Sequence, residues 1–416
     1  MKLKTFVRKV RHRLSTEASG MWDRMLYMLR VPVKVPVPEG EGPLLLYMGE
    51  RYQHHVPRIA KWVVRKSNWR TMLMCHRHYF PKKYDSSVYH GKATFRNPWH
   101  LRRILLHLRD KVDLVHAFGP YSLYPGIIRR ETDIPLIDDL KDINISYFGL
   151  KPPFAYFRKD LPHERYLMEN AHGIISSSFE AAGAYREYGI PQRPPSIFFP
   201  IYTDNDLFTA RKKTFNPDEI HIVYVGGVVG SHRDPRIYGT IQFHPIIDLL
   251  SAQKIHFHIY PAPSTLPEDY EEYREMARQN PYLHLHDPVP QAQLADEIAK
   301  YDFGWLAFYL EDTSRRFNKL GRGTSVKLFN YLESGVPLIM SPDLEFQAFM
   351  AKRYEGALII KKEQIGELGE MIRGLDYAAM EKRLKEQRET LSVKAQLGRL
   401  LAFYNRFSRR KATLSD

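Results

Sequence analysis

Short apolar runs alternate with helix-sized segments along most of this chain. Strands are expected at residues 44–48, 71–74, 114–116, 135–137, 173–176, 222–225, 256–260, 303–306, 337–340 and 357–360. Helices are expected at residues 56–66, 99–108, 121–130, 164–170, 180–188, 238–250, 294–299, 326–333, 344–352 and beyond Lys362. Short apolar strands separated by helices of this length are typical of a parallel sheet covered on both faces. The sequence therefore predicts an α/β fold.

The alternation is interrupted by a polar stretch after Pro200 and starts again at Ile222. It predicts two doubly wound, Rossmann-like domains over residues 41–205 and 206–385, with an N-terminal extension and linker (1–40) and a C-terminal helical segment (386–416). Ligands of such sheets bind beyond the carboxyl ends of the strands. We therefore expect the domains to face each other across a ligand-binding cleft.

Cysteine content and charge narrow the class of protein. The single cysteine, Cys75, excludes an intramolecular disulfide framework and an all-cysteine zinc site, which favours a reducing cytoplasm. The net charge of +15 makes nucleic acid, anionic lipid and phosphate-bearing small molecules the candidate partners. No apolar run has the roughly 18–20 residues of a membrane span, and the basic N-terminus lacks the apolar core of a secretory signal. We expect a cytoplasmic protein, soluble or peripheral on the membrane.

The first 38 residues have a composition of their own. They carry nine Lys or Arg against Glu17 and Asp23, a net charge of +7, and apolar residues recur at helical spacing over 6–14 and 21–29. This pattern predicts a basic amphipathic helix, with residues 1–34 able to lie on an anionic membrane surface. The alternative is that these helices pack on the body of the protein while their charges are solvated. The spaced prolines of residues 31–40 predict a stiff, extended linker.

The segment from Gly323 to Met340 has the features of a phosphate-binding site. A glycine-bearing loop leads into a helix whose first turn offers Thr324 and Ser325, with Lys327 close behind. Exposed N–H groups at a helix start, the helix dipole, two hydroxyls and a cation together form a diphosphate site. The alternative is an ordinary capped helix that ends at Gly335.

The same segment resembles the retaining GT-B glycosyltransferases of family 4, whose C-terminal halves carry S-x-K-L-F-E-Y-L-A-x-G-x-P-V-I. Matching residues are Ser325, Lys327, Leu328, Phe329, Tyr331, Leu332, Gly335, Pro337 and Ile339. The resemblance extends to Asp113–Pro120, to Asp139-Leu-Lys-Asp142, to the stretch from Glu164 to Ser178, to Pro200–Phe208 and to Ile222–Gly227. It covers about residues 43–385, and in this fold the last helices commonly cross back onto the first domain.

The resemblance implies a donor site that departs from the family in places. Asn330 and Arg322 stand where the family has a pair of glutamates. The glutamate nearer the helix normally accepts hydrogen bonds from the ribose of the nucleotide. Asn330 can still accept through its amide oxygen, more weakly because it is neutral, and Arg322 could instead face phosphate. Phe118 replaces a family histidine, and Pro261-Ala-Pro263 replaces a Gly-x-Gly.

Transfer from a nucleotide sugar needs the charge of the leaving diphosphate neutralised. In metal-free GT-B enzymes, cations and helix N-termini do this. The candidates here are Lys327, Arg322, Arg233 and Arg236, the last two following Gly226 and Gly227. Lys327 is favoured among them. Arg233 and Arg236 could equally belong to a solvated helix start.

Proton transfer and sugar positioning need groups at the ends of the N-terminal strands. These are His116, Asp138, Asp139 and Asp142. A carboxylate there could act as base in an inverting reaction or orient sugar hydroxyls in a retaining one; the resemblance favours retention. The alternative for Asp139 or Asp142 alone is a helix cap.

Pairs of histidines such as His256/His258 and His284/His286 raise the question of a metal site. Because apolar Phe257 and Leu285 alternate with them, we expect these pairs to line strand faces, with no metal bound. The resemblance implies no cofactor besides the nucleoside-diphosphate sugar donor.

These observations favour a glycosyltransferase that transfers a sugar from a nucleoside-diphosphate sugar to a glycan or lipid-linked glycan, in bacterial surface polysaccharide biosynthesis by analogy. One alternative is a sugar-nucleotide epimerase of the same fold, and another is a non-catalytic binder of anionic glycan or lipid. Nucleic acid is the least favoured partner and none is expected, because the basic residues are dispersed and no nucleic-acid module is recognisable.

Overall fold

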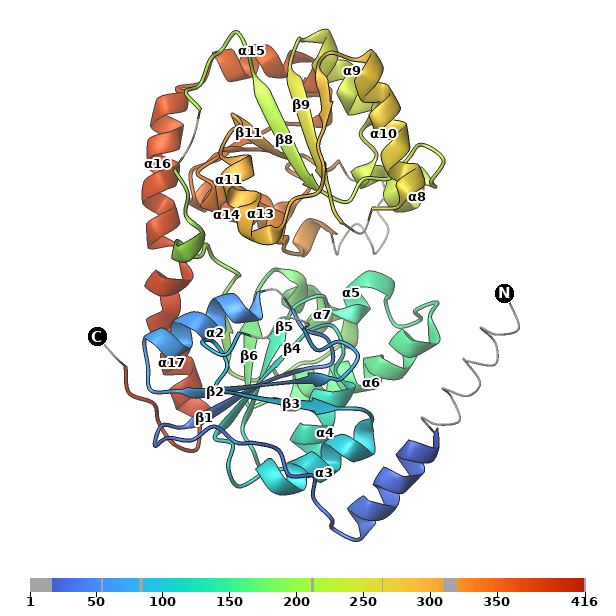
Figure 1. The fold of residues 1–416 in the computed structure, drawn as a ribbon, viewed down its shortest axis with the longest axis vertical. Coiled ribbons are helices and arrows are strands. Elements are labelled where there is room, and N and C mark those ends of the chain that lie inside the picture. The colour runs from blue at the N-terminus through green and yellow to red at the C-terminus, as the bar shows by residue number, and fades with distance from the viewer. Residues whose placement is uncertain are drawn as a thin grey trace. The chain divides into compact units, whose positions relative to one another are not determined.

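The computed structural model describes residues 17–53, 55–81, 85–210, 213–263, 265–309 and 320–414. The chain forms two compact units (Figure 1). The first unit comprises Met1–Phe199 together with Leu397–Asp416, and the second comprises Pro200–Gln396. Each unit is built around one parallel sheet.

The first unit contains a seven-stranded sheet in the order β3-β2-β1-β4-β5-β6-β7, in which every pairing is parallel. Its strands are β1 (Leu44–Gly49), β2 (Arg70–His76), β3 (Gly91–Phe95), β4 (Leu114–Phe118), β5 (Leu136–Leu140), β6 (Gly173–Ser176) and β7 (Ser196–Phe198). Its helices include one over residues 17–28, α2 (Val56–Arg65), α3 (Pro98–Leu108), α4 (Leu123–Glu131), α5 (Asn144–Phe148), α6 (Ala155–Asn170), α7 (Glu180–Tyr188) and most of α17 (Val393–Phe407).

The second unit contains a six-stranded parallel sheet in the order β10-β9-β8-β11-β12-β13. Its strands are β8 (His221–Gly226), β9 (His256–Pro261), β10 (Leu283–Leu285), β11 (Phe303–Leu306), β12 (Leu338–Met340) and β13 (Ala357–Ile359). Its helices are η1 (Asn205–Leu207), α8 (Pro235–Tyr238), η2 (Gly239–Ile241), α9 (His244–Ala252), α10 (Pro267–Gln279), α11 (Gln291–Ile298), α13 (Val326–Glu333), α14 (Glu345–Arg353), η3 (Lys362–Glu367), α15 (Leu368–Arg373) and α16 (Tyr377–Thr390).

Burial of the central strands explains why they are apolar throughout. Every residue of β1 is buried, because helices cover both faces of the sheet; Figure 1 shows α2 on one side and α3 and α4 on the other. Asn97 ends the loop before α3, where its side chain accepts a 2.8 Å hydrogen bond from the backbone N–H of His100. Phe403 and Phe407 of α17 pack on Gly173 of β6, so the C-terminal helix belongs to the core of the first unit.

The strand order reverses direction once in each sheet, between β1 and β4 and between β8 and β11. In doubly wound sheets the carboxyl ends of the strands at such a reversal form the ligand-binding crevice. The ends where a site is expected are therefore those of β1 and β4 in the first unit and of β8 and β11 in the second.

The prediction of one helix over residues 238–250 is wrong. The structure has α8, the short η2 and then α9, which starts only at His244. Pro245 lies in the first turn of α9, and a proline disfavours helical geometry in the residue before it and cannot donate to a preceding turn. The expectation of continuous helix beyond Lys362 is wrong in part, because α17 ends at Phe407.

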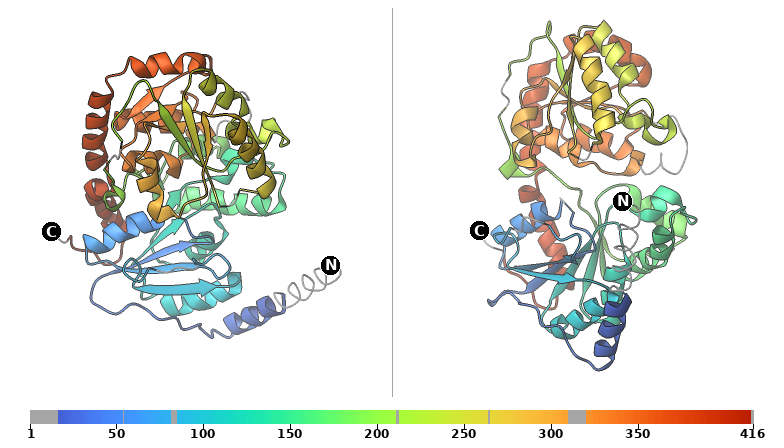
Figure 2. Two further views of the ribbon diagram at one scale, coloured as in Figure 1. Left: turned by 45° about the horizontal axis from the view of Figure 1, so that its top comes forward. Right: turned by 45° about the vertical axis from the view of Figure 1, so that its right-hand side comes forward.

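The N-terminal segment packs on the first unit. Asp23, fully buried on a helix over residues 17–28, accepts hydrogen bonds from Arg96 (2.8 Å), Asn97 (2.9 Å) and Arg103 (2.7 Å). The helix lies beside α3 in both views of Figure 2. The extended linker follows α3 as well, with a backbone hydrogen bond from Val33 to Arg103 of 3.0 Å. The first predicted stripe, residues 6–14, falls outside the described residues.

The opposite face of the same helix is exposed and apolar. Its exposed residues are Met21 (75%), Trp22 (58%), Met25 (43%), Met28 (71%) and the following Leu29 (66%). One face of this helix is therefore docked on the first unit, as the packing alternative expects, and the other is open; binding to a membrane surface stays a prediction. Among the described helices, none has the length and apolar content of a membrane span.

Candidate functional site

The second unit places a lysine at the reversal of its strand order. Lys327, in the first turn of α13, extends over the end of β8, where its Nζ lies 5.6 Å from the centre of the Tyr224 ring and 5.8 Å from that of Phe308. Its side chain also covers Gly226, the last residue of β8. The end of β8, the start of α13 and the Lys327 ammonium therefore lie together at one corner of the second unit.

The start of α13 is held in place by its own sequence. Ser325 is extended, and its Oγ accepts a 3.3 Å hydrogen bond from the backbone N–H of Lys327. One turn later, the hydroxyl of Tyr331 lies between β8 and β11, accepting from Val225 N (3.1 Å) and donating to Trp305 O (3.3 Å). The first N–H groups of a helix lack intrahelical partners, so a helix anchored in this way presents them at a defined position.

The electrostatics of this corner favour an anion. Burial lowers the pKa of the Lys327 ammonium, and aromatic rings rather than carboxylates face it. No carboxylate among the residues with described positions forms an ion pair with Lys327. Thr324 Oγ1 is buried, and no described group hydrogen-bonds to it. An anionic ligand would satisfy both the partly desolvated cation and the hydroxyl.

The other predicted cations differ from Lys327. Arg233 is paired with Asp269 (3.0 Å) and Glu268 (3.2 Å), so two carboxylates already offset its charge. Arg322 lies 3.8 Å from Glu345 and is half-buried. Asn330 is 7% exposed on α13. The side chain of Arg236 is outside the described part of the chain.

The two glycines predicted for this site take different environments. Gly226 has φ +146°, a backbone conformation that favours glycine, and its carbonyl accepts from the N–H of Ala262 at 2.9 Å. The carbonyl of Gly227 accepts a 2.8 Å hydrogen bond from the hydroxyl of Tyr224. Open space lies beside Gly227, because a β-carbon there would meet no atom within 4 Å.

In the first unit, two of the predicted catalytic residues form a buried chain of polar groups. Asp139 Oδ2 lies 3.0 Å from His55 Nε2 and 3.5 Å from His116 Nε2. His116 Nδ1 lies 2.5 Å from the hydroxyl of Tyr404, on α17. The side chains of His116 and Asp139 are 0% and 1% exposed. Because both are buried, they are suited to orienting their neighbours.

Burial alone would raise the pKa of Asp139, but His116 and His55 outweigh it and hold this pKa below its ordinary value. Burial lowers the pKa of His55, with Lys141 acting in the same direction. In this buried chain of polar groups, Asp139 is therefore favoured in its ionised form, whereas burial disfavours the charged form of His55. The pKa of Asp138, the preceding residue of β5, shifts in the opposite direction. Burial raises this pKa most, and the nearby acids Asp139, Glu164 and Asp160 raise it further, to about 8.

Asp142 is the more accessible of these acids. It follows β5 at the carboxyl edge of the sheet, is half-buried, and has a left-handed backbone with φ 57°. Non-glycine residues take this conformation at a cost, and such positions cluster at functional sites. The hydroxyl of Tyr147 lies 3.5 Å from its Oδ1.

Sequence reasoning missed two members of the buried chain. His55 and Tyr404 lie 84 residues before Asp139 and 288 residues after His116, respectively. No local motif marks either residue. A tertiary contact is the only signal that could have found them.

No protein-family model and no curated protein sequence matches this chain. Several solved structures do. A sucrose-phosphate synthase from Thermosynechococcus elongatus matches 87% of this chain and 99% of its own length, with a TM-score of 0.61 and 12% identity. A lipopolysaccharide outer core galactosyltransferase, WaaB, matches 86% and 99%, with a TM-score of 0.55 and 12% identity. A putative UDP-N-acetylglucosamine 2-epimerase from Listeria monocytogenes matches 88% and 97%, with a TM-score of 0.51 and 12% identity.

These likenesses cover most of both chains and concern the fold, because the identities are low. The two parallel sheets, each with one reversal of strand order, agree with them. The chain therefore has the GT-B fold, in which two Rossmann-like units make up the protein.

Proposed function

We propose that this protein is a glycosyltransferase that moves a hexosyl-type sugar from a nucleoside-diphosphate sugar to a glycan or lipid-linked glycan. The observation that carries the proposal is the Lys327 ammonium, half-buried and unpaired among the described residues, at the start of α13. The leaving group of such a reaction is a diphosphate, whose charge must be offset as it develops.

The donor is held by the second unit in this proposal. Lys327, the N–H groups at the start of α13 and the hydroxyls of Thr324 and Ser325 bind the diphosphate. Arg322, just before this loop, adds a second cation. Moving Arg322 away from Glu345 costs little free energy, because that carboxylate is 3.8 Å away and 60% exposed. Asn330 lies one turn further along α13 and is the candidate for the ribose hydroxyls. In this proposal, these groups neutralise the charge of the diphosphate without a metal ion or a further cofactor.

The acceptor or the sugar is positioned by the first unit. Asp142 is the carboxylate that touches substrate in this proposal, because it is half-buried at a strand end. His116 and Asp139 act through their neighbours, since both are buried. We propose retention of the anomeric configuration, by resemblance to family 4.

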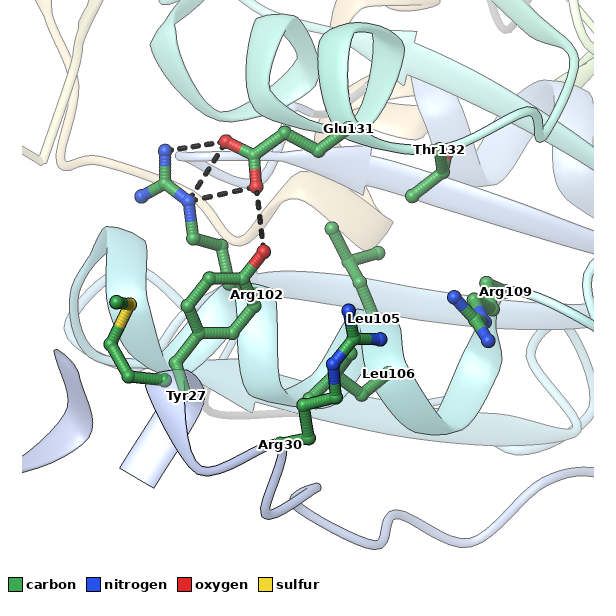
Figure 3. A pocket seen from close by; sticks show the side chains of 9 residues that line it. Tyr27, Arg30, Arg102, Leu105, Leu106, Arg109, Glu131 and Thr132 are labelled. Atoms are coloured by element: carbon green, nitrogen blue, oxygen red, sulfur yellow. Dashed lines mark hydrogen bonds and ion pairs between the residues drawn. The ribbon is translucent and has the colours of Figure 1, made fainter. Parts of the chain in front are cut away.

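The membrane is the proposed location, on its cytoplasmic face. The exposed apolar face of helix 17–28 is flanked by cations in the sequence, which is the pattern of an interfacial helix. Beside it lies a pocket of about 430 Å³, into which Figure 3 shows Arg30 and Arg109 projecting, while Arg102 is paired with Glu131 at 2.6 Å. A lipid-linked acceptor, in bacterial surface polysaccharide synthesis, would be presented at this surface.

An epimerase is the second candidate, because an epimerase shares the fold. The third is a binder of anionic glycan or lipid without catalysis, which the replacement of the paired glutamates by Arg322 and Asn330 would suit.

Two measurements separate these candidates. Thermal unfolding is followed with UDP-, GDP- and dTDP-sugars, since a ligand bound only by the folded state raises the melting temperature. Release of free nucleoside diphosphate is then followed with and without glycan acceptor. We expect stabilisation by one nucleotide class and release that depends on acceptor. Turnover of the sugar nucleotide without acceptor would favour the epimerase, and no response to any nucleotide would leave the binder.

A further inference from the structure

Five histidines gather on one face of the sheet of the second unit, at its β8–β9–β10 edge. His221 of β8 pairs in register with His256 of β9, and His258 of β9 pairs with His284 of β10. Their rings stack, with centroids 4.4 Å apart for the first pair and 4.3 Å for the second. The fifth, His286, follows β10. The strand-face arrangement expected from the sequence is present, and the pairing of parallel strands joins the separate pairs into one cluster.

The ring nitrogens form a directed set of hydrogen bonds. His221 Nδ1 lies 2.8 Å from His258 Nε2, and His256 Nδ1 lies 2.9 Å from His284 Nε2. His258 Nδ1 in turn lies 3.0 Å from His286 Nε2. A neutral imidazole has one donor nitrogen and one acceptor nitrogen. Protonation of His221, His256 and His258 at Nδ1 satisfies all three bonds and leaves the Nε2 lone pairs of His221 and His256 unused within the cluster.

A carboxylate lies at hydrogen-bond distance from one of these nitrogens, which carries a proton when it donates to the carboxylate in the metal-free protein. Glu219 Oε1 lies 3.3 Å from His221 Nε2, and one ligand atom from each of Glu219, His221 and His256 falls within 4.8 Å of the other two. Lys213 donates to the backbone oxygen of Glu219 at 3.3 Å, and its charge is offset by Asp302 at 2.9 Å. Glu219 is 59% exposed, which leaves a path for an ion from solvent.

We propose that Glu219, His221 and His256 bind a divalent transition-metal ion of the Zn²⁺ class. Two imidazoles and one carboxylate are a ligand set that Zn²⁺ accepts, with water in the remaining position. His258 and His284 are positioning residues, because a ligating histidine needs a hydrogen-bond acceptor for its other nitrogen to fix its tautomer and ring orientation. Small movements of three side chains on one sheet edge bring the donor atoms to bonding distance.

This site is separate from the proposed donor site and does not depend on it. The site lies at the amino end of β8, whereas Lys327 covers the carboxyl end. At about 3.3 Å per residue, the length of β8 puts roughly 16 Å between them. The ion would join the starts of β8 and β9 and the preceding loop, so its effect is on the stability of the second unit.

The test uses the full-length protein without a polyhistidine tag, stripped of metal by a chelator. Zn²⁺ binding is followed by calorimetry, Co²⁺ by its visible spectrum, and both by thermal unfolding. We expect one ion per chain, a raised melting temperature and a Co²⁺ spectrum of low coordination number. Glu219→Gln, His221→Asn and His256→Asn should each weaken binding at least tenfold, and His284→Asn about tenfold.

The control variant is His163→Asn in the first unit, where the Nδ1 of a half-buried histidine lies 2.9 Å from the guanidinium of Arg130, whose charge disfavours a second cation nearby. It should bind Zn²⁺ as the parent does. Glu219→Gln, on an exposed side chain, keeps the test valid if a histidine variant fails to fold. The assay uses Zn²⁺ at roughly 100 µM, so that even a weak site would be detected. The proposal is overturned if the parent binds no Zn²⁺ at this concentration. It is also overturned if the three ligand variants bind as well as the control.

Discussion

The side chain of Lys327 lies across Gly226, so that a β-carbon on Gly226 would stand 3.0 Å from Nζ and overlap Cε. Glycine at this position therefore does two things. It allows the backbone conformation of φ +146° at the end of β8, and it leaves room for the cation that the proposed donor site uses.

Gly226→Ala should displace the lysine and strain the backbone at once. We expect nucleotide binding to weaken by about tenfold or more, equivalent to about 1.4 kcal/mol. Titration of the nucleotide that stabilises the parent measures this. Gly366→Ala is the control, because a β-carbon there meets no atom within 4 Å; equal binding by both variants would remove Gly226 from the site.

Lys327→Ala should abolish most of the turnover while leaving the fold intact. Loss of a single preorganised charge at a developing anion costs about 100-fold or more in rate, and the folded protein loses a cation that has no described ionic partner. Acceptor-dependent release of nucleoside diphosphate is the assay. Lys352→Ala, on an exposed lysine of α14, is the control. A Lys327→Ala variant with parental turnover would contradict the proposed mechanism.

Asp138 predicts a pH dependence of stability. Its pKa is raised to about 8, mainly by burial, so between about pH 4 and 8 the folded state holds a proton that the unfolded state has lost. The unfolding free energy should therefore fall as pH rises through this window, by up to about 1.4 kcal/mol per pH unit.

Asp138→Asn removes this titration, and denaturant unfolding from pH 4 to 8 should show a shallower decline. Part of the slope should remain, since the pKa values of Glu164 and Asp160 are also raised by burial, to about 7 and about 6. Asp110→Asn, on an 83% exposed side chain, should keep the parental profile. An unchanged slope in Asp138→Asn would show that Asp138 is ionised in the folded protein.

Asp23→Ala should release helix 17–28 from the first unit. Removing one member of a buried ionic cluster leaves Arg103 and Arg96 without their carboxylate, at a cost on the order of 3 kcal/mol. Protease susceptibility within residues 17–40 and the unfolding free energy measure the effect. Asp110→Ala serves as control. Parental resistance in Asp23→Ala would mean that apolar contacts alone dock the helix.

The exposed face of the same helix predicts membrane binding. Replacing Met21, Trp22 and Met25 together by serine should reduce co-sedimentation with anionic phosphatidylglycerol vesicles by about tenfold or more, because the apolar area that enters the lipid is lost. Neutral phosphatidylcholine vesicles should bind weakly in every case. The matched control replaces three exposed apolar residues of the second unit, Leu249, Leu266 and Phe349. Equal loss in both triple variants would refute a specific role for helix 17–28.

The sequence predicted the buried central elements closely. Strands β6 and β11 and helices α7 and α13 have the predicted bounds, because their apolar periodicity is strong and local. Edge strands β3 and β7 and helices α5 and α10 were not predicted, and β10 was expected only through the alternation of its histidines with Leu285. Edge strands are short and partly exposed, as in β3 with only Ala93 and Phe95 buried, so their residues carry little of the apolar signal.

The candidate donor site was predicted in part. The motif around Ser325 placed the helix start and Lys327 correctly, because helix capping is a local property. Whether a predicted cation has a carboxylate partner is not a local property of the sequence. Arg233 and Lys327 look alike in sequence, yet Asp269, 36 residues away, pairs with the first.

By itself, then, the sequence determined the order of the central strands and of most helices, the two parallel sheets and the helix start at Ser325, since each follows from periodicity and capping over a few residues. Tertiary structure decided which polar groups meet. His55 and Tyr404 reach His116 and Asp139, and the histidines of β8, β9 and β10 form one cluster, because parallel strands align side chains from distant parts of the chain. The paired strands are far apart in the sequence, so which of their residues meet is seen only in the folded sheet.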